Sequence, residues 1–330
     1  MAWPRWLPHW QRLRNWLVRR LGLLRGRWLR LQVQAAVARW TWWPWPGSQA
    51  SWSCALYRPA ALADDDEALL IVLLHGCGQR AMSFAHATGL TRAADRGPFR
   101  LLCPEQRKLA NAWRCWNWFH PPAQNGQGEL AVVLQAIDAA AKLVRCGPVV
   151  VMGFSAGAGL AALLAFHHAA RFAAAVTVAA PPLLGRGSLQ DPRKVMKNGL
   201  SLTPTLAALH IAHCAPLLVL HGADDEVVSP LCPEQLSAQA LHVLQRTHKD
   251  LAETALIDGL EYRAGGERLV LRRRTLAGLG HAWSGAPGGH PHVTTEGPPL
   301  TELALAFLHE IGIAYVARSA GSAQTEMTHG

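Results

Sequence analysis

Apolar runs alternate with amphipathic stretches along most of the chain from residue 51 onward. The runs are short, rich in Val, Leu and Ile, and bounded by Gly, Pro or charged residues, which is typical of strands buried in a parallel sheet. We predict strands at 51–59, 68–76, 99–105, 148–155, 173–180, 215–222 and 267–276. Several stretches between these runs have helical spacing. We predict helices at 83–96, 128–145, 156–172 and 298–312. This alternation predicts an α/β fold with a parallel sheet covered on both faces.

The first 47 residues have a different pattern. Apolar side chains recur there at steps of three and four, which places them on one face of a predicted helix. They are Trp6, Trp10, Leu13, Leu17, Leu21, Leu24, Trp28 and Leu31. Arginines interrupt every apolar run, so the pattern predicts neither a standard signal peptide nor a membrane span of about 18 residues. Pro44 and Pro46 indicate a linker at 41–48.

We therefore predict three parts: a basic Trp/Arg-rich extension at 1–47, a folded domain at 48–315 and a disordered tail at 316–330. The net charge of +10 belongs mostly to the extension, which holds nine arginines and no acidic residue. The rest of the chain carries only about +1 (10 − 9), so we expect no nucleic-acid partner. The pattern of the extension is typical of a helix that binds a membrane or granule surface. The alternatives are that it packs its apolar stripe on the folded domain or is a poorly ordered extension.

The strongest chemical motif is Gly153-Phe154-Ser155-Ala156-Gly157, a G-x-S-x-G sequence. It follows an apolar strand and precedes a helix rich in Ala and Gly, as in the nucleophile elbow of serine hydrolases. The two glycines allow the neighbouring backbone to approach the turn, and the helix N-terminus points N–H groups at developing negative charge. We predict Ser155 as the nucleophile.

Partners for this serine follow in the chain. Asp224 and Asp225 lie in the polar loop after the 215–222 strand, and His281 follows the last strand among glycines. The order Ser, acid, His is that of α/β-hydrolases. This order does not decide which of the two aspartates orients the imidazole. His281 would accept the Ser155 proton during attack on an ester and return it to the leaving alcohol.

An oxyanion formed in that attack needs two N–H donors. One is predicted to be the amide of Ala156, directly after the nucleophile. The other is predicted to be the amide of Cys77, in the VLLHGCGQ segment that ends the 68–76 strand. A nucleophilic role for the Cys77 thiol is disfavoured because Ser155 occupies the elbow. No CxxC pair occurs and the His167–His168 and His290/His292 pairs are weak metal candidates, so we expect no metal and no cofactor.

These motifs resemble those of the PHB depolymerase family of esterases, α/β-hydrolases that act on polyhydroxyalkanoates or their oligomers. Relatives act as feruloyl or acetylxylan esterases. The matching blocks are LLHGCGQ (73–79), CPEQ…CWNWF (103–119), GFSAGAG (153–159), HGADDEVV (221–228) and GLGHAWSG (278–285). The resemblance implies that the domain at 48–315 is an α/β-hydrolase catalytic domain.

Site roles follow from the family pattern. It implies Ser155, Asp225 and His281 as the triad, with Asp224 as the second choice for the acid. It also invites a disulfide between Cys77 and Cys115. Three tryptophans fall on loops at the predicted catalytic edge, where exposed aromatic rings would suit an apolar ester, although packing under long loops is the alternative. They are Trp116, Trp118 and Trp283.

The chain also departs from the family habit. Many members are secreted with a clear signal peptide, and extracellular depolymerases add a polymer-binding domain after the catalytic one; the pattern here predicts neither. Residues 1–47 could replace that domain as a tether to a granule or membrane. The implied disulfide favours export slightly over a cytoplasmic or membrane-associated location. The resemblance thus implies a serine esterase that hydrolyses polyhydroxyalkanoates or their oligomers. One alternative is a feruloyl or acetylxylan esterase, and the other is a granule or membrane protein whose hydrolase fold is incidental.

Overall fold

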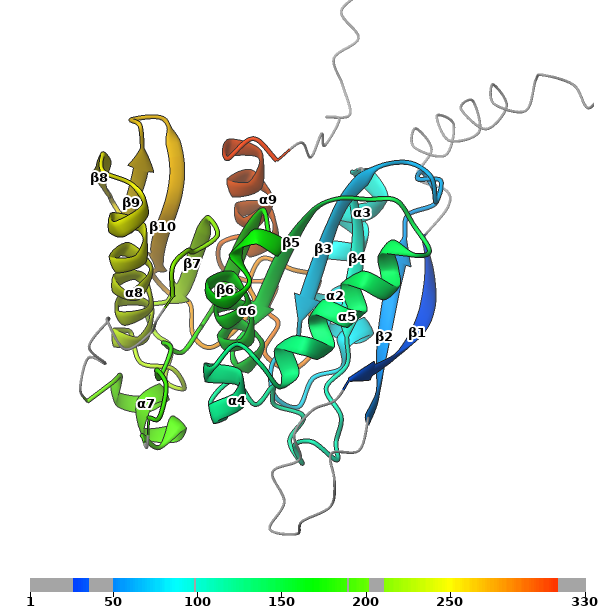
Figure 1. Cartoon of the computed structure of the whole chain (residues 1–330), viewed down its shortest axis with the longest axis horizontal. Helices are drawn as coiled ribbons and strands as arrows, with labels where there is room; N and C mark the ends of the chain where they lie inside the picture. The colour runs from blue at the N-terminus through cyan, green and yellow to red at the C-terminus, as the bar shows by residue number, and fades with distance from the viewer. Residues whose placement is uncertain (1–25, 36–49, 98, 189, 202–210, 314–330) are drawn as a thin grey trace, which may run out of the picture.

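The computed structural model describes residues 26–35, 50–97, 99–188, 190–201 and 211–313, and a single ten-stranded sheet runs through them (Figure 1). The strands are β1 (Arg27–Ala35), β2 (Ala50–Arg58), β3 (Ala68–Leu74), β4 (Phe99–Pro104), β5 (Cys146–Phe154), β6 (Ala174–Val178), β7 (Leu217–Gly222), β8 (Leu251–Leu256), β9 (Gly259–Ala264) and β10 (Arg268–Leu276). Their order across the sheet is β1-β2-β4-β3-β5-β6-β7-β10-β9-β8.

The centre of the sheet is parallel and its two margins are antiparallel. Strands β4, β3, β5, β6, β7 and β10 run in one direction. β2 pairs antiparallel with β4 and β1 with β2, while β9 and β8 form an antiparallel hairpin beside β10. Because all six central strands end at one edge, the loops that follow them lie together there.

Helices cover both faces of the sheet. They are α2 (Ala81–Ala87), α3 (Leu90–Arg96), α4 (Pro121–Gln124), α5 (Glu129–Ala141), α6 (Ala156–His167), α7 (Pro192–Asn198), α8 (Leu231–Thr247) and α9 (Leu300–Glu310), with a short 3₁₀ turn, η1 (Ala169–Arg171). α5, α6 and α8 pack on one face, and α2, α3 and α9 on the other (Figure 1). Each face has its own apolar core, which explains why the central strands are apolar throughout.

The strands and helices predicted from residue 51 onward are present, with three differences. The helix predicted at 83–96 is two helices, because Gly89 has a φ of 80° and ends the first. Pro121–Gln124 and Pro192–Asn198 form short helices that the pattern did not indicate. The region between 231 and 264, for which we predicted no element, forms α8 and the β8–β9 hairpin.

The helix predicted for the N-terminal region is wrong at its C-terminal end, because residues 27–35 form the strand β1. Leu31 and Val33 are buried, while Arg30, Gln32 and Gln34 on either side of them are exposed, so the side chains alternate with the period of two expected for a strand. This part of the predicted extension therefore belongs to the sheet. The rest of the amphipathic stripe, the 41–48 linker and the tail at 316–330 lie outside the described residues.

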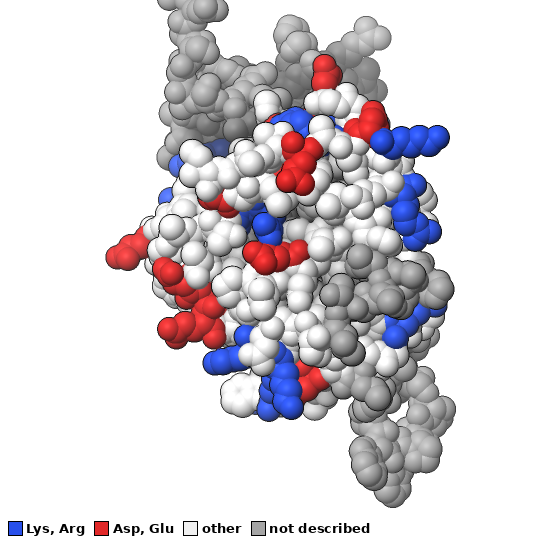
Figure 2. Space-filling model, turned by 90° about the vertical axis from the view of Figure 1, so that its left-hand side faces the viewer, with Lys and Arg blue, Asp and Glu red and all other residues white. Residues whose placement is uncertain are grey.

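A run of three arginines in β10 is engaged in ion pairs with nearby carboxylates. Arg272 pairs with Glu261 in β9 and with Glu310 in α9. Arg273 pairs with Glu234 in α8, and Arg274 pairs with Asp258. Figure 2 shows acidic and basic side chains interspersed on this end of the molecule. Such mixing gives no continuous basic patch on the described part of this face.

Candidate active site

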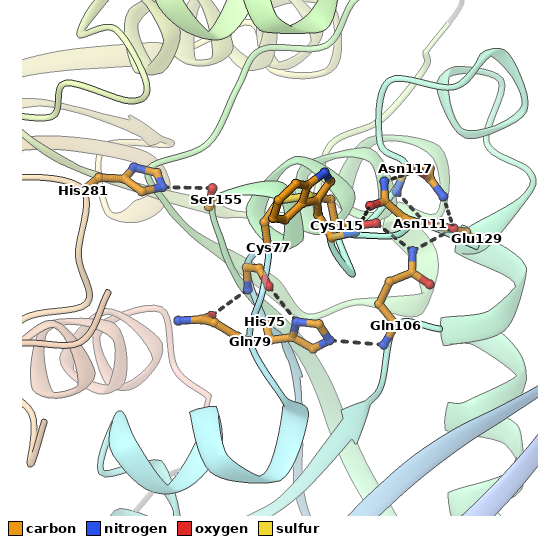
Figure 3. The surroundings of a disulfide bond; sticks show 12 residues. His75, Cys77, Gln79, Gln106, Asn111, Cys115, Asn117, Glu129, Ser155 and His281 are labelled. Atoms are coloured by element: carbon orange, nitrogen blue, oxygen red, sulfur yellow. Dashed lines mark hydrogen bonds between the residues drawn. A yellow bond between two sulfur atoms is a disulfide. The ribbon is translucent and has the colours of Figure 1, made fainter. Parts of the chain in front are cut away.

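Ser155 occupies a tight turn between β5 and α6. Its φ of 54° and ψ of −120° are unusual for a residue with a side chain, and its backbone N–H donates to the Val178 carbonyl at 2.9 Å. Holding a non-glycine residue there costs about 1–3 kcal/mol, which the surrounding packing must offset. The turn directs the hydroxyl away from the strand and towards His281 (Figure 3).

Gly153 and Gly157 make this turn possible. A Cβ on Gly153 would lie 2.3 Å from the Gly157 carbonyl oxygen, and a Cβ on Gly157 would lie 2.3 Å from the Leu74 carbonyl oxygen. Both contacts are with backbone, which cannot move aside as a flexible side chain can. The two glycines of the motif therefore allow α6 to begin directly against β5 and against the end of β3.

Three side chains from distant parts of the chain form one hydrogen-bonded row. His281 Nε2 lies 3.0 Å from Ser155 Oγ, and His281 Nδ1 lies 2.8 Å from Asp225 Oδ2. The Asp225 side chain is fully buried and that of His281 nearly so. The structure thus brings together the serine, the histidine and the acid predicted as a triad.

Asp225, rather than Asp224, is the acid in this row. It lies just after β7, and its Oδ1 accepts hydrogen bonds from the backbone N–H groups of Val227 and Val228 at 2.9 and 2.8 Å. Burial alone would raise the pKa of the Asp225 carboxyl, but the hydrogen bonds from His281 and from these two amides outweigh it and lower the pKa. Asp224 is exposed and its backbone N–H donates to the Leu279 carbonyl.

The loop after β3 lies beside the start of α6. A Cβ on Gly157 would be only 2.6 Å from the His75 carbonyl oxygen, so this loop and the elbow are in contact. Ala156 is the first residue of α6, where backbone N–H groups have no partner within the helix. The Cys77 amide has no hydrogen-bond partner within the described part of the chain. Both predicted oxyanion donors therefore come from segments that meet at Ser155.

A disulfide joins Cys77 to Cys115, with the two Cα atoms 4.2 Å apart. It connects the loop after β3 to the loop between β4 and α4. A second link lies beside it, because the Gly78 N–H donates to the Trp113 carbonyl at 2.7 Å. The other five cysteines are free.

The three tryptophans predicted to line an exposed surface are buried, so their expected exposure is wrong. Trp116 and Trp283 are 0% exposed and Trp118 is 2% exposed. Trp116 stacks on Trp52, and the Trp283 indole N–H donates to Thr301 at 3.0 Å. Each ring is large enough to fill a gap beneath a long loop, and burying it removes apolar area from water.

The exposed apolar side chains of this region are ones that the motifs did not indicate. Trp113 is 76% exposed and Leu109 is 89% exposed, both on the loop that carries Cys115. The backbone carbonyl of Trp113 accepts a hydrogen bond from the Gly78 N–H, so Trp113 lies next to the loop after β3. Periodicity could not identify it, because a loop tryptophan is exposed or buried according to the path of the loop.

The described residues contain no group of three or more His, Cys, Asp or Glu side chains that could hold a metal ion. His168 Nε2 lies 2.9 Å from the Gly126 carbonyl oxygen, and His292 Nδ1 lies 3.2 Å from the carbonyl of His281. Both weak metal candidates are thus next to backbone carbonyls. No helix in the described ranges is both long and apolar enough to cross a membrane.

Comparison with known proteins agrees with this architecture. Residues 52–254 match the model of the family described as esterase PHB depolymerase. The chain belongs to this family. It is 28% identical over 236 residues to poly(3-hydroxyalkanoate) depolymerase C of Paucimonas lemoignei, an alignment that covers 66% of this chain and 56% of that protein. The chain thus spans little more than half of the depolymerase.

Two further proteins are similar to this chain, one in sequence and one in fold. The chain is 28% identical over 205 residues to feruloyl esterase B of Neurospora crassa, covering 57% of this chain and 68% of that protein. Its structure matches the acetyl xylan esterase of Aspergillus awamori with a TM-score of 0.62 and 14% identity, covering 87% of this chain and all of that one. The resemblance read from the motifs and the predicted α/β-hydrolase fold are both confirmed.

Proposed function

We propose that the protein is a serine esterase that hydrolyses carboxylic esters through an acyl-enzyme. The observation that carries this proposal is the row Ser155–His281–Asp225, which joins a strained elbow serine to a buried carboxylate through one imidazole. Family membership supports the same conclusion. An incidental hydrolase fold would not require this alignment of a strained serine with two partners.

Each group has one part in the proposed reaction. His281 Nε2 takes the proton of Ser155 Oγ as that oxygen attacks the ester carbonyl, and the imidazolium then protonates the leaving alcohol. Asp225 keeps the other proton on Nδ1 and stabilises the imidazolium. The amides of Ala156 and Cys77 donate to the oxyanion. Water, deprotonated by His281, then attacks the acyl-enzyme and releases the acid and Ser155.

For the substrate we favour polymers or oligomers of hydroxyalkanoates. The depolymerase of Paucimonas lemoignei is named for poly(3-hydroxyalkanoate), and its similarity extends over two thirds of this chain. Exposed Trp113 and Leu109 give the loop beside Cys77 an apolar surface suited to an extended polyester. The alternative is a feruloyl or acetylxylan esterase, which the other two relatives support by name.

We also propose that the basic N-terminal segment attaches the enzyme to a granule or membrane surface. Its tryptophans and arginines have the spacing of an amphipathic interfacial helix in the sequence. The disulfide between Cys77 and Cys115 supports an oxidising compartment, as in exported proteins.

A fluorophosphonate probe tests the chemistry. We expect it to label the full-length protein and not the Ser155→Ala variant, whose kcat on a short p-nitrophenyl ester should fall at least about 10⁴-fold. Labelling that persists in the variant would assign the reaction to another residue, and a wild-type protein that neither reacts with the probe nor hydrolyses any ester would exclude the esterase proposal.

A substrate panel then separates the two substrate classes. We expect oligomers of 3-hydroxybutyrate to have a higher kcat/KM than methyl ferulate or acetylated xylan. The opposite order would favour the carbohydrate-esterase alternative while leaving the serine mechanism intact.

A further inference from the structure

His75, which the triad mechanism does not use, is completely buried directly before the predicted oxyanion loop. Its Nδ1 lies 2.8 Å from the carbonyl oxygen of Gly76, and its Nε2 lies 3.1 Å from the backbone nitrogen of Gln106. Figure 3 shows the imidazole of His75 with one ring nitrogen bonded to the backbone of Gln106. Both ring nitrogens are therefore occupied by main chain from two different loops.

The partners determine the tautomer of His75. Burial lowers the pKa of the imidazole, so the ring is neutral and has one donor and one acceptor nitrogen. The Gln106 N–H can only donate, which makes Nε2 the acceptor. The proton is then on Nδ1, from which it is donated to the Gly76 carbonyl.

This hydrogen bond controls the direction of the neighbouring amide. The carbonyl of Gly76 and the N–H of Cys77 belong to the same planar trans peptide, so they point in opposite directions. A donor that holds the Gly76 oxygen on one side fixes the Cys77 N–H on the other. That N–H has no partner in the described part of the chain, so it is available to an oxyanion.

The backbone N–H of Gln79 also donates to the Gly76 carbonyl, at 3.4 Å, and further contacts hold the residues around this peptide. The Gly76 N–H donates to Gln79 Oε1 at 2.8 Å, and Gln79 Nε2 donates to the Pro291 carbonyl at 2.6 Å in the loop after His281. A Cβ on Gly76 would lie 2.8 Å from the ring of Phe154, the residue before the serine. The oxyanion loop is thus packed against the elbow and bonded to the loop of the base.

Behind His75 lies a buried amide–carboxylate cluster that positions Gln106. The Gln106 side chain donates to Glu129 Oε1 at 2.8 Å and to the Cys115 carbonyl at 2.9 Å. Asn117 donates to the same carboxylate from its backbone N–H at 2.7 Å and from its side chain at 2.6 Å. Burial raises the pKa of Glu129, and these hydrogen bonds offset part of that rise.

We infer that His75 is a positioning residue for the oxyanion hole: with its proton held on Nδ1 by the Gln106 amide, it fixes the Gly76–Cys77 peptide so that the Cys77 N–H faces the reacting carbonyl. This inference rests on the proposed esterase function. His75 itself touches neither the substrate nor Ser155, and it acts only through the peptide.

A matched pair of variants separates its two hydrogen bonds. The side-chain amide of His75→Asn can donate from the position of Nδ1, and the side-chain oxygen of His75→Gln can accept at the position of Nε2. We expect His75→Asn to keep kcat within about threefold of the wild type. We expect His75→Gln to lower kcat by about 10–100-fold with KM nearly unchanged, which is less than the full loss of an oxyanion donor.

A transition-state analogue provides the readout that a general loss of structure would not give. The inhibition constant of a trifluoromethyl ketone should rise in His75→Gln by the same factor by which kcat falls, and should stay near the wild-type value in His75→Asn. Equal effects of the two substitutions, or a fall in kcat without a change in that constant, would overturn the inference. A wild-type protein without esterase activity would instead overturn the proposed function.

A second measurement reads the tautomer of His75 in the wild-type protein itself. In full-length protein labelled with ¹⁵N-histidine, the resonances lost in His75→Asn identify His75. We expect them to show a neutral ring with the proton on Nδ1 at pH 7. If His75→Asn does not fold, nitrogen–proton correlations to the Gly76 and Gln106 neighbours make the assignment. A proton found on Nε2 would contradict the inference.

Discussion

Asp224 and Asp225 are adjacent, chemically identical residues that differ in what surrounds each side chain. Asp225 turns inward after β7, where His281 and two backbone N–H groups bind its carboxylate, while Asp224 remains in solvent. The lowered pKa of Asp225 keeps the group ionised at neutral and mildly acidic pH. The difference between the two neighbours is therefore one of environment.

Asp225→Asn should lower kcat by about 10³–10⁴-fold. Its amide oxygen can keep the bonds from Val227 and Val228, but its NH₂ group would then face His281 Nδ1 and favour the tautomer that cannot accept the Ser155 proton. The matched control, Asp224→Asn, should stay within about twofold of the wild type because its side chain is exposed. Steady-state kinetics on a soluble ester measures both, and a larger loss in Asp224→Asn would reassign the acid.

The same substitution has a stability consequence that depends on pH. Because the folded-state pKa of Asp225 is lowered, its carboxylate contributes stability above its unfolded pKa of about 3.9, and this contribution is lost as pH falls through the folded-state value. The difference in unfolding free energy between wild type and Asp225→Asn should shrink below about pH 4. Urea denaturation at several pH values measures it.

Sequence reasoning could not rank the tryptophans by exposure. Trp116, Trp118 and Trp283 belong to the CWNWF and GLGHAWSG sequences, yet all three pack inside, whereas Trp113, two residues before Cys115, is exposed. A motif records which residues a loop contains. Whether each ring points into the core depends on the contacts of that loop with the rest of the fold.

Among the elements, the two loops joined by Cys77 and Cys115 are the ones most directly linked to the proposed oxyanion hole. Neither loop has regular structure of its own at these positions. Their shape comes from the disulfide, the Gly78–Trp113 hydrogen bond and the Glu129 cluster. Local propensity is weak in such segments, which is why their conformation could not be predicted from the residues alone.

Removing this disulfide should destabilise the protein. The cross-link spans a sequence separation of 38 residues, and its loss in the Cys77→Ser/Cys115→Ser variant should lower the unfolding free energy by about 2–4 kcal/mol. The control Cys146→Ser changes a free, half-buried cysteine and should have a smaller effect. Chemical denaturation compares the variants.

Thiol counting tests the same bond independently. Five of the seven cysteines should react under denaturing conditions before reduction and all seven afterwards. Seven reactive thiols before reduction would mean that the bond is absent in the purified protein.

β1 illustrates how an element can satisfy two patterns. Trp28 and Leu31 fit the end of a helical stripe, but Leu29, Leu31 and Val33 also fit a strand with alternating faces. Pairing with β2 decides between them, because residues 27–35 find partners along the whole of Ala50–Arg58. The strand is thus selected by a non-local contact that a window of sequence does not contain.

At the scale of the whole molecule, the sheet order brings the site together. Ser155, Asp225 and His281 are separated by as many as 126 residues, yet each follows a central strand and therefore lies at the same edge. Their loops meet because β5, β7 and β10 are parallel. The chain order of the motifs predicted this convergence without predicting its distances.

Truncation tests the role of the N-terminal segment. Deleting residues 1–25 should abolish sedimentation with polyhydroxybutyrate granules or anionic liposomes, while hydrolysis of a soluble ester continues at the wild-type rate. Unchanged sedimentation would refute surface attachment through this segment.

Deleting residues 1–47 should have a further effect, because it also removes β1. The loss of buried Leu31 and Val33 should lower stability by about 1.5–3 kcal/mol for each side chain. Equal stability of the two truncated proteins would show that pairing of β1 with β2 does not stabilise the fold. The shorter deletion is therefore the one that isolates surface binding from folding.

The sequence by itself determined the elements of the central sheet, the G-x-S-x-G turn, the order of the reactive residues and the family. These properties depend on short-range periodicity and on residue types within single segments. Only the tertiary structure decided that three motif tryptophans are buried, that residues 27–35 join the sheet, and that His75 holds the Gly76–Cys77 peptide. Each of these depends on atoms brought together from distant positions in the chain, where packing and the need to pair buried polar groups outweigh local preference.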